Sequence, residues 1–154
     1  MTKIIASKIA IQRIKLYKTN LNLSEEFLNN PYKPASYEVA FGHQSAVDFE
    51  KKSIRFRLET ILDGVNSKKE RMGLHAEYGI EFHFTVENFE KFIVVKEGNK
   101  KVDSNLGVTL LSIVFSTSRG IILDRTQGTY LDGLILPVID PKELFDKLNK
   151  DNQL

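Results

Sequence analysis

Apolar and polar residues alternate along four segments of the first ninety residues, the pattern of strands in a sheet with one buried face. The alternation is cleanest in 74–86, and it recurs in 37–49 and 54–62. In 8–16 it slips once, between Ile11 and Ile14, which is what a β-bulge produces. We therefore expect four antiparallel strands, the first of them bulged.

Segment 102–122 predicts a long helix that is apolar around most of its circumference. One stripe at helical spacing holds Leu106, Leu110, Ile113 and Ile121, and a second holds Val108, Leu111, Phe115 and Ile122. A surface helix needs only one apolar face. We interpret this helix as packed on its own sheet and also on a second subunit; the alternative is a helix enclosed within one monomer. The predicted contact with the second subunit comprises Leu106, Leu110, Ile113 and the small residues Ser112, Ser116 and Gly120.

The remaining segments are irregular or short. Residues 21–36 predict a long connection, in which Ser24 could begin one helical turn, and 88–95 fits a short helix or a strand. Pro137 keeps the apolar run 134–139 from being a central strand. Asp140 then caps a closing helix that carries Leu144, Phe145 and Leu148.

This order of elements indicates the fold class. Strands come first and helices follow, which favours an α+β fold. We expect one domain over residues 1–154, with a four-stranded antiparallel sheet and both a long helix and a short C-terminal helix on one face.

Composition narrows the function classes. The 22 basic and 20 acidic residues give a net charge of +2, and this charge balance does not by itself indicate nucleic-acid binding. There is no cysteine, so structural disulfides and thiolate zinc sites are excluded. The N-terminal stretch lacks the apolar core of a signal peptide, and no window reaches the roughly 20 apolar residues of a membrane span. We expect a cytoplasmic protein that does not insert into membranes.

The sequence offers few parts for catalysis. It contains no nucleophile elbow, phosphate loop, metalloprotease helix or dinucleotide fingerprint. His75 and His83 share a strand face, but eight residues of strand separate them by about 27 Å, so they cannot bind one metal. Asp124 and Asp132 could be posed as an acid–base pair, but nothing in the sequence around them supports that role. We therefore expect no enzyme, no metal and no cofactor.

Apolar residues exceed what a sheet and two helices need. The connection 21–36 and the run 134–139 hold leucines, tyrosines and a phenylalanine. They are either ordinary core or a groove that accepts extended, unfolded segments. Such a groove would bind by apolar burial, at about 25 cal/mol per Å², and useful affinity would need several linked sites.

Two segments resemble the SecB export chaperones. Ile11-Gln12-Arg13-Ile14 is similar to the first strand of that family, and the long helix, Gly128-Thr129 and the run 134–139 are similar to its helix and proline-containing crossover. The pattern is closest to a divergent SecB-like branch. The resemblance implies a tetramer built as a dimer of dimers, with the long helices between sheets. It also implies an ATP-independent holdase for unfolded or nascent polypeptides.

The same resemblance implies which residues act. Clients would lie in grooves beside the loop after the first strand and the crossover, which here points to Leu21, Leu23, Phe27, Tyr32, Leu134 and Leu136. Glu77 falls on the strand that docks the SecA export motor in the family. Some SecB-like proteins instead guard the antitoxin of a toxin–antitoxin system, so a dedicated interaction protein with one partner is the alternative function.

Overall fold

Four long strands form one antiparallel sheet in the computed structural model, which describes residues 2–151 and the side chains of residues 2–147. The strands are β1 (Ile9–Leu23), β2 (Ser36–Asp48), β3 (Ser53–Val65) and β4 (Arg71–Val86). Their order across the sheet is β1-β4-β3-β2, so β1 and β2 are its two edges. The predicted α+β fold with four antiparallel strands is confirmed.

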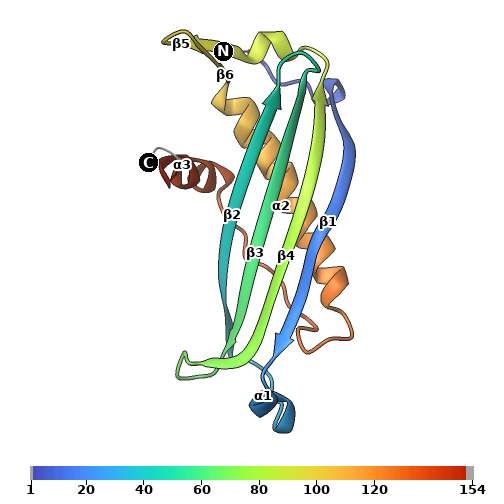
Figure 1. Ribbon diagram of the computed structural model, residues 1–154, viewed down its shortest axis with the longest axis vertical. Coiled ribbons are helices and arrows are strands. Elements are labelled where there is room, and N and C mark those ends of the chain that lie inside the picture. The colour runs from blue at the N-terminus through green and yellow to red at the C-terminus, as the bar shows by residue number, and fades with distance from the viewer. Residues whose placement is uncertain (1, 152–154) are drawn as a thin grey trace.

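Helices cover one face of this sheet. The long helix α2 (Ser104–Thr126) crosses behind the sheet on a diagonal, and α3 (Pro141–Asp151) lies beside β2 (Figure 1). Because α2 runs diagonally, the upper part of β1 is left uncovered. The smaller elements are η1 (Ala6–Lys8), α1 (Glu25–Asn29), η2 (Phe89–Phe92), β5 (Ile93–Lys96) and β6 (Asn99–Val102).

The two faces of the central strand β4 differ: one faces the core and the other is the open face of the sheet. Its alternate residues are fully or nearly fully buried, and they include Leu74, Ala76, Ile80, Phe82 and Phe84. Residues between them point to the other face, where His75, Glu77, Glu81 and His83 are only half-buried. The alternation seen in the sequence thus separates residues that point into the core from residues that point toward water.

Two β-bulges in β1 change the face of the sheet to which the following side chains point. The pairing with β4 shifts first between Ile11 and Arg13, as predicted, and again between Leu16 and Lys18. The second shift was not foreseen. It makes Tyr17 an extra residue in the strand, and the ring of Tyr17 lies on Gly79, where an added Cβ would approach it to 2.6 Å.

Helix α2 begins as predicted but buries a different face. Asp103 caps its N-terminus by accepting a hydrogen bond from the backbone N–H of Asn105, at 2.8 Å. The helix is long and apolar enough to cross a membrane by length and composition alone. The core helix of a soluble protein passes the same test, and α2 packs on its own sheet and on α3. Its buried residues are Leu106, Gly107, Leu110, Leu111, Val114, Phe115, Ser118, Ile122 and Thr126. It therefore has one wide buried face and not the two predicted stripes.

Two expectations for the connecting segments change. Strand β1 continues to Leu23, so Leu21 and Leu23 belong to the sheet and not to an irregular connection. Ser24 then caps α1 by accepting a hydrogen bond from the N–H of Phe27 at 3.1 Å. Segment 88–95 is part 3-10 helix and part strand. The crossover, residues 127–140, has no helix or strand, and the side chain of Leu148 lies outside the described residues.

Candidate functional site

An open groove lies between the segment after α1 and the start of the crossover. Its volume is 510 Å³, and it is lined by Pro31, Tyr32, Lys33, Pro34, Tyr37, Thr129, Tyr130, Asp132 and Gly133. Three tyrosines and two prolines line it together with Lys33, Thr129 and Asp132, so its surface is partly aromatic and partly polar. We call it the tyrosine groove.

The floor of the tyrosine groove is held by Phe27. This side chain is only 3% exposed, and its ring meets Tyr130 edge to face, with the centroids 5.2 Å apart. Tyr32 packs on it from the other side at 6.5 Å. Short helix α1 is in turn fixed against β4, because the N–H of Ser24 donates to the carbonyl of Gly73 at 2.8 Å. The aromatic wall is therefore preformed on a rigid support.

The six predicted client residues divide between this groove and the core. Tyr32 lines the groove and is 49% exposed. Phe27, Leu134 and Leu136 are each less than 5% exposed, so the prediction that they contact clients directly is corrected: they are core residues under the groove and crossover. Leu21 and Leu23 are half-buried in β1.

The crossover exposes apolar residues other than its leucines. Ile135 is 71% exposed and Val138 is 81% exposed, the largest values among the described large apolar side chains. The crossover backbone is anchored where Arg119 Nε donates to the carbonyl of Leu136 at 3.2 Å. Apolar surface is thus available on this segment, but at Ile135 and Val138 and not at the predicted Leu134 and Leu136.

Sequence reasoning missed Tyr37 and Tyr130 as groove residues. Both are amphipathic and suited to a half-exposed binding wall. A usable signal was the concentration of tyrosine next to proline and glycine, in Pro31-Tyr32 and in 128–133.

The residues of α2 that were predicted to contact a second subunit also differ in burial. Leu106 and Leu110 are completely buried against the sheet, so they cannot contact a second subunit as predicted. Ile113 and Ser112 are half-buried. Ser116 and Gly120 are exposed, and a Cβ added at Gly120 would meet nothing within 4 Å. Only the small-residue strip points away from the subunit's own core.

The open face of the sheet carries charged groups that are joined in pairs. Glu77, the predicted docking residue, lies 3.1 Å from Lys18 Nζ and 3.2 Å from His75 Nε2. The hydrogen bond with His75, and then that with Lys18, lowers the pKa of Glu77. Asp63 likewise contacts His75 at 2.8 Å. The carboxylate of Glu77 is therefore charged and already contacts the Lys18 ammonium group and the His75 ring.

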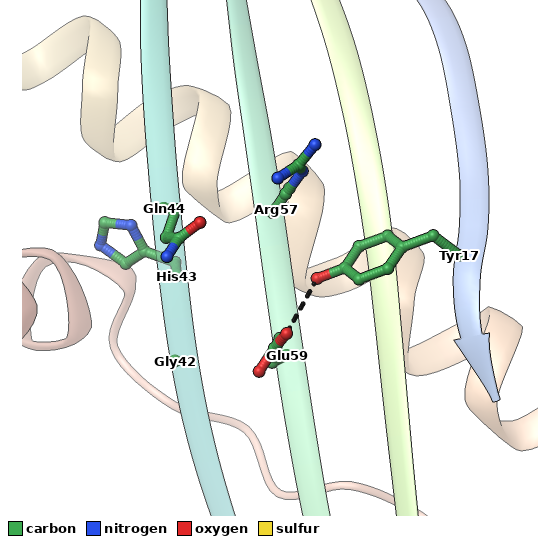
Figure 2. A pocket seen from close by; sticks show the side chains of 6 residues that line it. All are labelled: Tyr17, Gly42, His43, Gln44, Arg57 and Glu59. Carbon is green, nitrogen blue, oxygen red and sulfur yellow. Dashed lines mark hydrogen bonds between the residues drawn. The ribbon is translucent and has the colours of Figure 1, made fainter. Parts of the chain in front are cut away.

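A small hollow lies near the middle of the same face, above Gly42 (Figure 2). The Tyr17 hydroxyl donates to Glu59 at 3.2 Å, and the Arg57 guanidinium stands over the Tyr17 ring, 5.7 Å from its centroid. Arg57 also donates to Glu81, and this bond lowers the pKa of Glu81 to about 2. Burial, followed by the charge of Glu59, raises the pKa of Tyr17. These groups satisfy one another, and no nucleophile and base are paired among them.

Metal chemistry has no matching ligand set in the described residues. No group of three or more histidine, aspartate or glutamate side chains among residues 2–147 is arranged to hold an ion. Among the aspartate and glutamate side chains of residues 2–147, only that of Glu81 forms an ion-pair contact with His83, at 2.6 Å.

Comparison with known proteins identifies the architecture. No protein-family model and no curated protein sequence matches the chain. Among solved structures, it is similar to the SecB-like chaperone Rv1957 of Mycobacterium tuberculosis, in complex with a ChAD peptide from the antitoxin HigA1. The TM-score is 0.60 at 14% identity, covering 87% of this chain and 92% of that one. A second match, a protein of unknown function from Streptococcus agalactiae, has a TM-score of 0.42 at 10% identity, covering 84% and 97%. This chain has the SecB-like fold.

Proposed function

We propose that the protein is a nucleotide-independent holdase that binds unfolded or nascent polypeptides in the tyrosine groove. The observation that carries the proposal is the groove itself: an open, preformed aromatic surface on a SecB-like fold. Tyrosine rings offer large contact area at low entropic cost, and every extended chain presents side chains that can pack on them. Client binding would thus depend on apolar and aromatic content and not on a specific sequence.

Affinity at one such groove would be modest. Burying apolar surface contributes about 25 cal/mol per Å², and ordering a flexible client opposes this gain. Useful retention therefore needs several grooves on one assembly. The outward strip with Ser116 and Gly120, the exposed Ile135 and Val138 of the crossover and the uncovered edge of β1 support an oligomer, for which we propose the tetramer of the fold family. We also propose that it acts in the cytoplasm.

The test compares two tyrosines of equal exposure on different surfaces. Tyr32 in the groove is 49% exposed, and Tyr17 on the open sheet face is 46% exposed. Tyr32→Ser should reduce suppression of aggregation of an unfolding client at least threefold, measured by light scattering without ATP. Tyr17→Ser is the matched control and should keep most of the activity. Equal suppression by both variants, or none by the native protein at several-fold molar excess, would refute the groove.

A dedicated interaction protein is the second candidate function. It is supported by the complex of the M. tuberculosis chaperone with an antitoxin peptide. In that case one partner should dominate the proteins that co-purify from the native host, and generic clients should be ignored. Mass spectrometry of the co-purified proteins separates the two functions, since a holdase would retain a broad mixture.

A role in export is the less supported form of the proposal. Docking of a basic motor segment would need free carboxylates, whereas Glu77 is already paired with Lys18 and His75. Releasing those partners would offset part of any new attraction.

A further inference from the structure

The open face of the sheet has two halves of opposite charge. The half toward the β2–β3 turn carries Arg13, Lys15, Arg55 and Arg57 against two carboxylates, Glu81 and Asp48. Asp48 is held in the turn, where it accepts hydrogen bonds from the backbone N–H groups of Glu50 and Lys51. The half toward α1 carries Glu38, Glu59, Asp63 and Glu77 against Lys18 and Arg71. We call the first half the basic patch; nothing in the proposed client binding uses it.

The strand register brings the cations of the basic patch together. Arg13 of β1 and Arg55 of β3 both pair with His83 of β4, so they flank the same residue. Lys15 and Arg57 flank Glu81 in the same way, one row further along. Rows on one face are about 7 Å apart and neighbouring strands about 4.8 Å apart, so these four cations occupy a compact area. The first bulge of β1 is what places Arg13 on this face, because it sets Arg13 opposite His83.

Most of these cations have no intramolecular partner. Among residues 2–147, Arg13, Lys15 and Arg55 form neither an ion pair nor a side-chain hydrogen bond. In the acidic half both cations are paired: Lys18 with Glu77 at 3.1 Å, and Arg71 with Glu38 at 3.3 Å. Arg55 further lines a polar hollow of 320 Å³ with Arg57, Gln44 and Ser45. This hollow offers guanidinium and amide donors, and no carboxylate lines it.

We propose that the basic patch is a docking site for an acidic polypeptide segment whose carboxylates bind at Arg13 and Arg55, with Lys15 and the hollow beside Gln44 and Arg57 completing the contact. Arginine guanidinium groups bind carboxylates through paired hydrogen bonds. Arg13 and Arg55 are two strands apart, about 10 Å, and carboxylates three residues apart lie on the same side of a polyproline II helix, about 9 Å from each other. The site therefore fits a segment in the polyproline II conformation with acidic residues at every third position.

The charge distribution favours an acidic peptide over nucleic acid. A nucleic-acid backbone carries closely spaced phosphates along its whole length. Continuing along the strands toward α1, it would soon pass over Glu59 and Glu77, which lie one to two rows beyond the patch. A short acidic segment has no such conflict, since its charges can end where the patch ends.

The test uses a labelled twelve-residue peptide with glutamate at every third position and serine and glycine between. Fluorescence anisotropy at low salt should show saturable binding that weakens as salt is added. Arg13→Gln with Arg55→Gln should weaken binding at least about tenfold, because both predicted carboxylate contacts are lost. The matched control, Lys100→Gln with Lys101→Gln on the β5–β6 hairpin, removes the same charge and should change affinity less than twofold. Both double variants should keep the native circular dichroism and melting temperature.

Each other outcome overturns the proposal. The site is refuted if the native protein does not bind the glutamate peptide at millimolar concentration, or binds the corresponding glutamine peptide equally well. Equal loss in both double variants would show only a net-charge effect. Stronger binding of a twelve-residue oligothymidine that is lost in the arginine variant would assign the patch to nucleic acid. Self-association abolished by the arginine variant in sedimentation without peptide would assign it to the acidic half of a second copy. Tyr32→Ser should leave peptide binding intact, which separates this test from that of the groove.

Discussion

The two edges of the sheet differ in what covers them. On β2, His43 is 8% exposed and its ring stacks on Phe145 of α3 at 6.3 Å. On β1, Ile11 and Ile14 are each more than 40% exposed. Ile11 and Ile14 pair with the buried Phe84 and Phe82, so they lie on the core side of the sheet without a helix above them. One edge is closed by the chain's own C-terminal helix, and the other is open.

This difference follows from the path of α2. The helix crosses the sheet diagonally and its N-terminal half lies nearer β2, where α3 can pack on it (Figure 1). The contact is close: an added Cβ at Gly107 of α2 would approach the Phe145 ring to 2.8 Å. An exposed sheet edge with apolar side chains is a site for pairing with another chain. We therefore expect changes at the β2 edge to alter subunit stability and changes at the β1 edge to alter assembly.

The largest expected effect is at the closed edge. Phe145→Ala removes the ring that covers His43 and should cost about 2 kcal/mol of unfolding free energy, since the side chain is only partly buried. For a chain of this length that lowers the melting temperature by roughly 4–8 °C. Thermal unfolding by circular dichroism measures it.

A double-mutant cycle provides the control for this contact. In a helix, Gly→Ala normally stabilises by about 1 kcal/mol. Gly107→Ala should fail to do so in the native protein, because the new Cβ meets Phe145, yet should stabilise the Phe145→Ala variant. Additive effects in the cycle would mean that α3 does not pack on Gly107.

At the open edge, Ile14→Glu should shift the protein toward smaller assemblies. The side chain is 41% exposed in the subunit, so subunit stability should change by less than about 0.5 kcal/mol. Native mass spectrometry and sedimentation report the assembly, and urea unfolding reports the stability. Val94→Glu, at 45% exposed on the β5–β6 hairpin, introduces the same charge away from the edge. Loss of assembly in the Val94 variant but not in the Ile14 variant would contradict an interface at β1.

Most of the sheet could be predicted because alternation records the side of the sheet directly. The bulge after Ile11 and the Asp103 cap could also be predicted from the sequence, since each is a local pattern of a few residues. Strand β1 was underestimated at its end, where Leu21 and Leu23 continue the alternation past Asn20 and Asn22. Asparagine is uncommon in strands, and tertiary pairing with β4 overrides that preference here.

The candidate site could be predicted only as a region. In the irregular crossover no repeating geometry sets which apolar residues point inward, so Leu134 and Leu136 could not be told from Ile135 and Val138. On α2 the buried face depends on the crossing angle with the sheet, which the sequence does not specify. The groove itself forms where segments about a hundred residues apart meet, as Tyr32 and Tyr130 do around Phe27.

The smallest expected effect is the pH dependence that His43 gives to the closed edge. His43 has no hydrogen-bond partner for either ring nitrogen in the described residues, and its aromatic neighbours are Phe56 and Phe145. Burial lowers the pKa of His43 below its usual value near 6.5. Above the unfolded pKa both states hold a neutral ring and stability is full. As pH falls below it, the unfolded state takes up the proton first, so stability declines toward the lower folded pKa.

His43→Leu should remove this decline, because leucine fills similar apolar space without a titrating group. The melting temperature of the native protein should fall relative to that of His43→Leu as pH is lowered from about 7.5 to about 5.5. His75 is the matched control on the same sheet: its hydrogen bond to Asp63 raises its pKa, so it contributes stability that is present at acid pH and lost as pH rises through the folded pKa. His75→Asn should therefore steepen the dependence that His43→Leu flattens. Parallel profiles for the native protein and His43→Leu would mean that α3 does not keep this ring from water, and the contrast between the two edges would then fail at its closed side.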